Sequence, residues 1–110
     1  MLDVRLYMLQ RVTALIMVPL TIGHLAVMIY AVQSGLTVAE IMGRTKGSLF
    51  WFLFYGSFVC AVSVHAAIGL RVILHEVFRI DGQILGFLAW GICLGLLFMG
   101  GRAVLAVTML

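Results

Sequence analysis

Charged residues are scarce in this 110-residue chain, and their scarcity excludes a water-soluble fold. Only 10% of the residues carry a charged side chain, whereas 65% are hydrophobic. A soluble domain of this size keeps a large part of its surface in water, so a chain this apolar would expose extensive hydrophobic patches. The composition therefore predicts an integral membrane protein whose apolar surface is covered by the lipid bilayer.

Proline and cysteine are also rare. The single proline, Pro19, lies inside the first apolar segment. There it cannot donate a helical hydrogen bond to the carbonyl of Leu15, so we expect it to kink a helix. Cys60 and Cys93 lie in different apolar segments, at a spacing that matches no metal motif. We interpret both as reduced, small hydrophobic side chains and expect neither a disulfide nor a cysteine metal site.

Three long segments, residues 12–39, 47–70 and 82–101, contain no charged residue. About 20 helical residues cross the roughly 30 Å hydrocarbon core of a bilayer, and backbone groups away from water must be satisfied within the helix. We therefore predict an all-α fold that forms a single transmembrane domain over residues 1–110. Its three transmembrane helices are expected at about residues 6–32, 48–78 and 82–105, within a larger helical bundle.

The basic residues favour one orientation in the membrane. Lys and Arg prefer cytoplasmic loops, and the excess here lies at the end of the bundle that carries the N-terminus. We therefore expect a cytoplasmic N-terminus, in a bacterial inner membrane. The net charge of +3 is explained by anionic lipid at the helix ends, so no nucleic acid partner is expected. The two groups are Arg5, Arg11, Arg71 and Arg79 at one end, and Arg44, Lys46 and Arg102 at the other.

Two histidines, His24 and His65, lie within apolar segments. Ionisable side chains there are costly and mark function, although a lone histidine can also hydrogen-bond a neighbouring helix. Histidine nitrogen is a common ligand of haem iron, which suits a dry interior. Ser57, Ala61 and Gly69 share a helix face with His65 and leave room for a flat porphyrin. We therefore interpret both histidines as haem and metal ligands.

The two histidines differ in depth. His24 lies about 20 Å of helix beyond Arg11, and His65 lies about 9 Å from Arg71, so their levels differ by about 11 Å. Two ligands of one iron must lie at nearly the same level. The sequence therefore predicts two haems, each completed by a histidine from another polypeptide.

The motifs resemble a known family. His65-Ala66-Ala67-Ile68-Gly69-Leu70-Arg71 resembles the H-x-x-x-G-[IL]-R segment of the cytochrome b anchor subunits of succinate dehydrogenase and fumarate reductase. Gln10-Arg11-Val12-Thr13-Ala14 lies where that family carries H-R-x-[ST]-G, and the resemblance covers about residues 7–76. Gln10 and Ala14 depart from the usual histidine and glycine, so the propionate contact and the close packing of those residues are not carried over.

The resemblance implies that His65 is the axial ligand of the haem b nearer the iron-sulfur subunit. His24 resembles the helix I ligand of the two-haem members. Arg11 is implied to contact quinone or a haem propionate, and Arg71 lies at the same aqueous boundary. Gly69 and Ser57 complete the candidate cofactor-binding set.

The resemblance also implies the partners. A second small membrane-anchor subunit supplies the other haem ligands, and iron-sulfur and flavoprotein subunits dock on the cytoplasmic face. Electrons from succinate then pass to quinone, the substrate of the membrane subunits. The chain itself holds no catalytic residue for succinate, so we expect it to be non-catalytic alone.

Three alternatives remain. The chain could anchor a quinol:fumarate reductase that runs the reverse reaction, or it could be a haem-free anchor whose histidines only pair with neighbouring helices. It could also be a small membrane transporter subunit, but proton coupling in such a protein needs a carboxylate within the membrane. The four carboxylates are expected at helix ends or in loops: Asp3, Glu40, Glu76 and Asp81.

Overall fold

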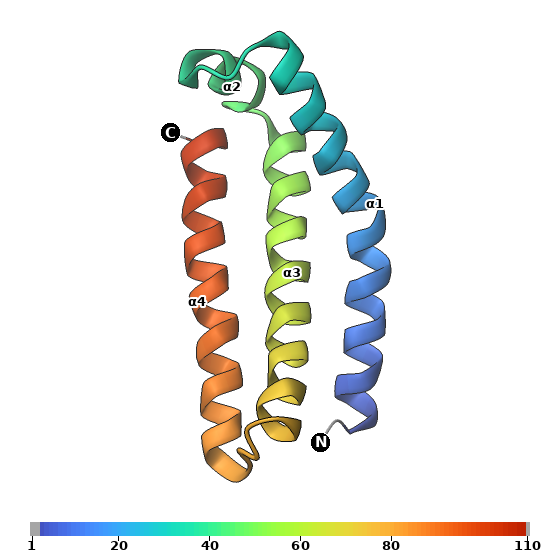
Figure 1. The fold of residues 1–110 in the computed structure, drawn as a ribbon. Helices are drawn as coiled ribbons and strands as arrows, with labels where there is room; N and C mark the ends of the chain where they lie inside the picture. The colour runs from blue at the N-terminus through green and yellow to red at the C-terminus, as the bar shows by residue number, and fades with distance from the viewer. Residues whose placement is uncertain (1–2, 110) are drawn as a thin grey trace.

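The computed structural model describes residues 3–109 and consists of helices in that range (Figure 1). Three of them, α1 (Val4–Ser34), α3 (Leu49–Glu76) and α4 (Gly82–Thr108), are long and apolar enough to cross a membrane. The short helix α2 (Val38–Thr45) lies in the connection between α1 and α3. The described residues contain no strand. The prediction of an all-α fold with three spans is confirmed.

Helix α3 is the central element, because it packs against both α1 and α4 (Figure 1). The N-terminus and the α3–α4 connection lie at one end of the molecule, and α2 lies at the other end with the C-terminal end of α4. The bundle measures 48 × 24 × 23 Å, so its long axis exceeds the roughly 30 Å hydrocarbon core. The two ends therefore reach the aqueous boundaries.

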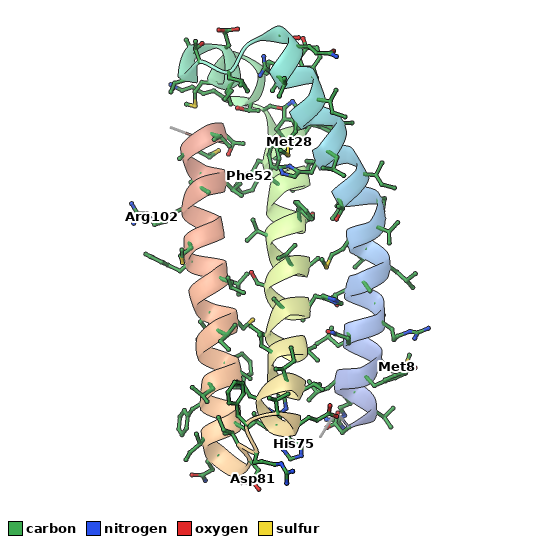
Figure 2. The ribbon with its side chains drawn as sticks, viewed as in Figure 1. Met8, Met28, Phe52, His75, Asp81 and Arg102 are labelled. Atoms are coloured by element: carbon green, nitrogen blue, oxygen red, sulfur yellow. The ribbon has the colours of Figure 1, made fainter. Side chains whose placement is uncertain are left out.

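The interior of the bundle is small, and among the described residues α3 contributes more buried side chains than any other helix. Ala61, Ala67 and Ile68 of this helix are buried. Side chains of the outer helices, such as Met8 of α1 and Arg102 of α4, project away from the bundle (Figure 2). Large apolar faces of α1 and α4 are thus left for lipid or for a partner helix.

Helix α1 is capped at its start and bent in its middle. The Asp3 carboxylate accepts a hydrogen bond from the backbone N–H of Leu6 at 2.8 Å and so satisfies one of the free amides of the first turn. The helix ends at Gly35, whose φ of 136° suits glycine. Pro19 lies midway between these ends, and Figure 1 shows the two halves of α1 at an angle. The missing N–H of proline explains the bend.

The last residue of α2 and the segment that follows it are hydrogen-bonded to the end of α4. The Thr45 hydroxyl donates to the carbonyl of Val107 at 2.6 Å, and the backbone N–H of Gly47 donates to the carbonyl of Thr108 at 2.6 Å. Both threonines are buried. These two bonds, called the α2–α4 clasp below, satisfy carbonyls that a helix end leaves without an intrahelical partner.

The α3–α4 connection turns the chain back within five residues. Arg79 has a left-handed φ of 58°, and Gly82 has a φ of 68° at the start of α4. The Nδ1 of His75 donates to the carbonyl of Ile80 at 3.1 Å. The third histidine of the chain therefore serves the turn, away from the two histidines inside the spans.

Candidate functional site

The interface between α1 and α3 holds both intramembrane histidines. His65 projects from α3 and contacts Thr13 of α1. His24 projects from α1 and packs against Tyr55 and Phe58 of α3. Each histidine is half-buried. Each histidine is therefore partly covered by the facing helix.

His65 is held at one of its two ring nitrogens. Its Nδ1 lies 3.2 Å from the Oγ1 of Thr13. The Thr13 hydroxyl is also within donating distance of two carbonyls of its own helix, Leu9 at 2.9 Å and Gln10 at 3.0 Å. The other ring nitrogen of His65, Nε2, makes no hydrogen bond within residues 3–109. The ring is thus anchored on one edge and free on the other.

Gln10 occupies the space beside Gly69, one turn beyond His65. A Cβ added to Gly69 would lie 3.6 Å from the Nε2 of Gln10, which is ordinary van der Waals contact. The Oε1 of Gln10 is buried without a hydrogen-bond partner among residues 3–109. Gly69 therefore faces the amide of Gln10.

His24 has a different environment, formed by aromatic rings. Its ring centroid lies 5.4 Å from that of Phe58 and 6.1 Å from that of Tyr55, the latter in an edge-on arrangement. Its Nδ1 is buried and has no hydrogen-bond partner in the described part of the chain. The preceding residue, Gly23, brings the two helices close, because an added Cβ would lie 3.0 Å from the ring of Phe54.

The two histidines lie at different depths in the bundle. His65 is opposite Thr13, whereas His24 is opposite Phe58. Along α3, His65 and Phe58 are separated by about 10 Å, and along α1, Thr13 and His24 are separated by about 16 Å. A single iron cannot bind both rings in this arrangement.

A groove of about 640 Å³ runs along the same interface. It is lined by Thr13 of α1 and by small residues of α3, including Gly56, Ser57 and Ala61. Ser57 is exposed and Ala61 is buried. Two of the three small residues that the sequence groups with His65 thus line the groove, while the third, Gly69, lies against Gln10.

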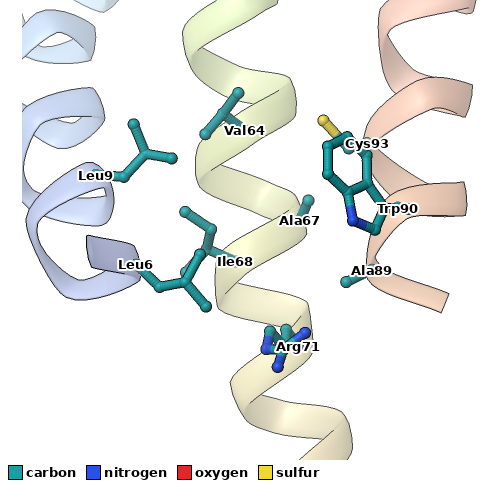
Figure 3. Close-up of a pocket in the computed structure, with 9 residues that line it drawn as sticks. All are labelled: Leu6, Leu9, Val64, Ala67, Ile68, Arg71, Ala89, Trp90 and Cys93. Carbon is teal, nitrogen blue, oxygen red and sulfur yellow. The ribbon is translucent and has the colours of Figure 1, made fainter. Parts of the chain in front are cut away.

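The two candidate arginines are not in contact with each other. Arg71 lines a second cavity, of about 220 Å³, between α1, α3 and α4, together with Leu6 and Trp90 (Figure 3). The Nε of Arg71 is buried, and no residue from 3 to 109 forms a hydrogen bond with it. Arg11 is exposed, and its guanidinium carbon lies 5.8 Å from the ring centroid of Tyr7. The two guanidinium groups therefore lie in different surroundings, Arg71 in a cavity and Arg11 on the surface.

The donor set fits a haem. Within residues 3–109, no three side chains of His, Cys, Asp or Glu come together. A haem brings its own porphyrin nitrogens and takes one protein ligand on each face of the iron, commonly a histidine nitrogen. His65 offers such a nitrogen, because Nδ1 is engaged by Thr13 and Nε2 is free of hydrogen bonds. The Nδ1 of His24 is also buried without a hydrogen-bond partner within the part of the chain that the structure describes.

Sequence reasoning gave no role to Thr13 and none to Gln10. Both lie in the segment that was compared with H-R-x-[ST]-G, at its first and fourth positions. The hydroxyl of Thr13, at the fourth position, was the signal that could have identified this residue, because a polar side chain in an apolar helix needs a hydrogen-bond partner. Its partner is His65, 52 residues away along the chain.

One comparison with known proteins identifies relatives. A family model described as "Succinate dehydrogenase/Fumarate reductase transmembrane subunit" matches residues 1–99. No curated protein and no solved structure matches the chain significantly. The matched region includes α1, α2, α3 and most of α4, and therefore both histidines.

Proposed function

Because this chain belongs to the succinate dehydrogenase/fumarate reductase transmembrane subunit family, we propose that it is a haem b-binding anchor that passes electrons from succinate to quinone. The chain is an integral membrane protein, and membership of the family implies that it associates with the other subunits of complex II. The partners proposed are an iron-sulfur subunit, a flavoprotein subunit and a second small anchor subunit. The proposed direction is succinate oxidation.

One observation carries the haem proposal: His65 has one ring nitrogen engaged and the other available. The contact with Thr13 holds Nδ1, and Nε2 makes no hydrogen bond within the described residues. An imidazole fixed in this way needs little reorganisation to bind a metal. A haem held by His65 would supply one-electron chemistry between the iron-sulfur subunit and quinone. The second anchor subunit is proposed to provide the ligand on the opposite face.

His24 is proposed as the ligand of a second haem. Its depth separates it from His65, so it needs an iron of its own. Its buried Nδ1 lacks a partner among residues 3–109, and buried polar atoms are seldom left unsatisfied in a finished assembly. The aromatic rings of Tyr55 and Phe58 exclude water from the ring. As for His65, the second anchor subunit would bring the opposing ligand.

The end of the bundle with the N-terminus is proposed to face the cytoplasm and to receive the iron-sulfur subunit. Arg11 and Arg71 lie toward this end, and each has a guanidinium group that no acidic side chain of the described residues pairs. A guanidinium can donate to a quinone carbonyl or to a carboxylate. Arg11 is therefore the proposed quinone contact, and Arg71 a propionate or quinone contact.

The test is to purify the whole complex and measure haem by the pyridine haemochrome method against covalently bound or extractable flavin. Two haems per flavin are expected. The variant H75A provides a matched control, because His75 binds the α3–α4 connection, and it should keep both haems. A wild-type complex that contains flavin and iron-sulfur clusters but no haem bands would leave the chain as a haem-free anchor.

A further inference from the structure

Thr13 is one of very few polar side chains buried in the bundle, and its hydroxyl has three neighbours. It is 5% exposed. Its Oγ1 lies 2.9 Å and 3.0 Å from the carbonyls of Leu9 and Gln10, and 3.2 Å from the Nδ1 of His65. The first two contacts stay within α1, whereas the third crosses to α3. The hydroxyl thus connects the backbone of one helix to the histidine of the other.

The number of protons in this arrangement decides the direction of the bond. A hydroxyl has one proton and two acceptor lone pairs. The two carbonyls are acceptors only, and they share that proton, as threonines in helices commonly donate to the carbonyls three and four residues earlier. The Oγ1 of Thr13 must then accept from His65, so the Nδ1 carries a proton. In a neutral imidazole, this leaves the lone pair on Nε2.

We infer that Thr13 is the residue that positions His65 as a metal ligand and sets its donor strength. The inference rests on the function proposed above. The bond fixes the tautomer that presents Nε2 to iron, and it limits rotation of the ring, because Thr13 is buried in a rigid helix. Partners of this kind orient ligating histidines and raise their basicity, and losing one typically costs about 10- to 100-fold in metal affinity.

The bond also has an expected electronic effect. A hydroxyl that donates to a backbone carbonyl is polarised and becomes a better acceptor. Acceptance from Nδ1–H increases the electron density of the ring, which favours ferric iron, the more positive state. Removing the acceptor should therefore favour ferrous iron and raise the reduction potential of the haem bound by His65. No charged residue is needed for this effect, which suits the apolar interior.

Two substitutions at Thr13 separate the hydroxyl from the shape of the side chain. T13V keeps the branched shape and removes the hydroxyl, whereas T13S keeps the hydroxyl. The matched control is T21V, two turns further along α1, because Thr21 is half-buried and makes no side-chain hydrogen bond within the described residues. All variants are studied in the purified complex, and the inner haem is identified as the one that H65A removes.

The midpoint potential of that haem and the g-values of its ferric electron paramagnetic resonance spectrum are measured. In T13V, we expect the ratio of ferric to ferrous affinity to fall about tenfold, which is about 59 mV upward for a one-electron couple. The g-values should shift because the ring is less constrained. T13S and T21V should resemble wild type. Loss of the inner haem in T13V but not in T13S would also support the inference.

Two results would overturn the inference. One is an unchanged potential and spectrum in T13V. The other is an equal change in T13V and T13S, which would mean that side-chain shape matters and the hydroxyl does not. If T13V does not assemble, T13A removes the same hydroxyl with less bulk and carries the same comparison. A wild-type complex without haem would refute the proposed function itself, whereas haem of unaltered potential in T13V refutes only the role of Thr13.

Discussion

The two intramembrane histidines occupy the same helix interface but different environments. His65 has a hydrogen-bond partner on the facing helix, and His24 has only aromatic rings beside it. A buried polar atom without a partner costs about 1–3 kcal/mol. Within residues 3–109, the chain therefore engages one ring nitrogen of His65, whereas it leaves the buried Nδ1 of His24 without a hydrogen bond. On the function proposed above, the His65 ring is held in place before a partner binds, and the His24 ring is not.

The largest effect is expected from H65A. Removal of an axial ligand should cost more than the loss of its hydrogen-bonding partner, so inner-haem affinity should fall more than about 100-fold. The measurement is haem per flavin, which should drop from two to one in the purified complex. Succinate oxidation with an artificial acceptor should persist, because that chemistry belongs to the soluble subunits. A normal haem content would remove His65 from the ligand set.

H24A should also remove a proposed haem ligand, but its effect on the affinity for the other haem should be smaller than that of H65A on the inner haem, since no partner among residues 3–109 preorganises the His24 ring. The inner haem should remain, with an unchanged midpoint potential. The two variants therefore sort the haems by position. If H24A keeps both haems, His24 is a packing residue among Tyr55 and Phe58, and the distinction between the two environments concerns packing alone.

The same type of substitution, arginine to glutamine, can be made at both ends of the bundle, at Arg11 and at Arg44. Each guanidinium lies over a tyrosine ring of α1, Arg11 over Tyr7 at 5.8 Å and Arg44 over Tyr30 at 5.2 Å. R11Q should lower quinone reduction about tenfold, because a hydrogen bond to a charged group contributes about 1.5–3 kcal/mol. R44Q should leave it intact.

The assay for both arginine variants compares quinone reduction with reduction of an artificial acceptor. Only the quinone activity of R11Q should fall. Equal loss of both activities would indicate failed assembly, and a larger loss in R44Q would place the quinone at the α2 end.

The smallest effect is expected from G23A, which tests whether the two histidine environments are independent. The new Cβ would lie 3.0 Å from the Phe54 ring, so α1 and α3 must separate slightly beside His24. Overpacking of this kind costs about 1–3 kcal/mol. The haem that His24 is proposed to bind should be released at a lower temperature than in wild type. The release temperature of the haem that His65 is proposed to bind should not change. G91A is the matched control, since a Cβ there meets nothing within 4 Å.

The three spans, and the positions of His24 and His65 inside them, could be predicted from the sequence. The absence of charge over about 20 residues and an ionisable group within an apolar segment are both local signals. The sequence was not sufficient for the partners of those histidines. Thr13 and His65 are 52 residues apart, and their contact depends on how α1 leans on α3. The position of Gln10 against Gly69 depends on the same packing. When a helix is hydrophobic on all sides, its sequence does not indicate which face packs against a neighbouring helix.

The α2–α4 clasp has a consequence for how the protein is made. Thr45 and its acceptor, the carbonyl of Val107, are 62 positions apart, so the bond can form only after the ribosome has completed the last turn of α4. Until then, the Thr45 hydroxyl can donate to the carbonyl of Ile41 within α2, and the backbone N–H of Gly47 stays in water at the membrane surface. The first span and the central span are thus inserted before the polar connection between them has its final bonds, and synthesis of the last span completes that connection.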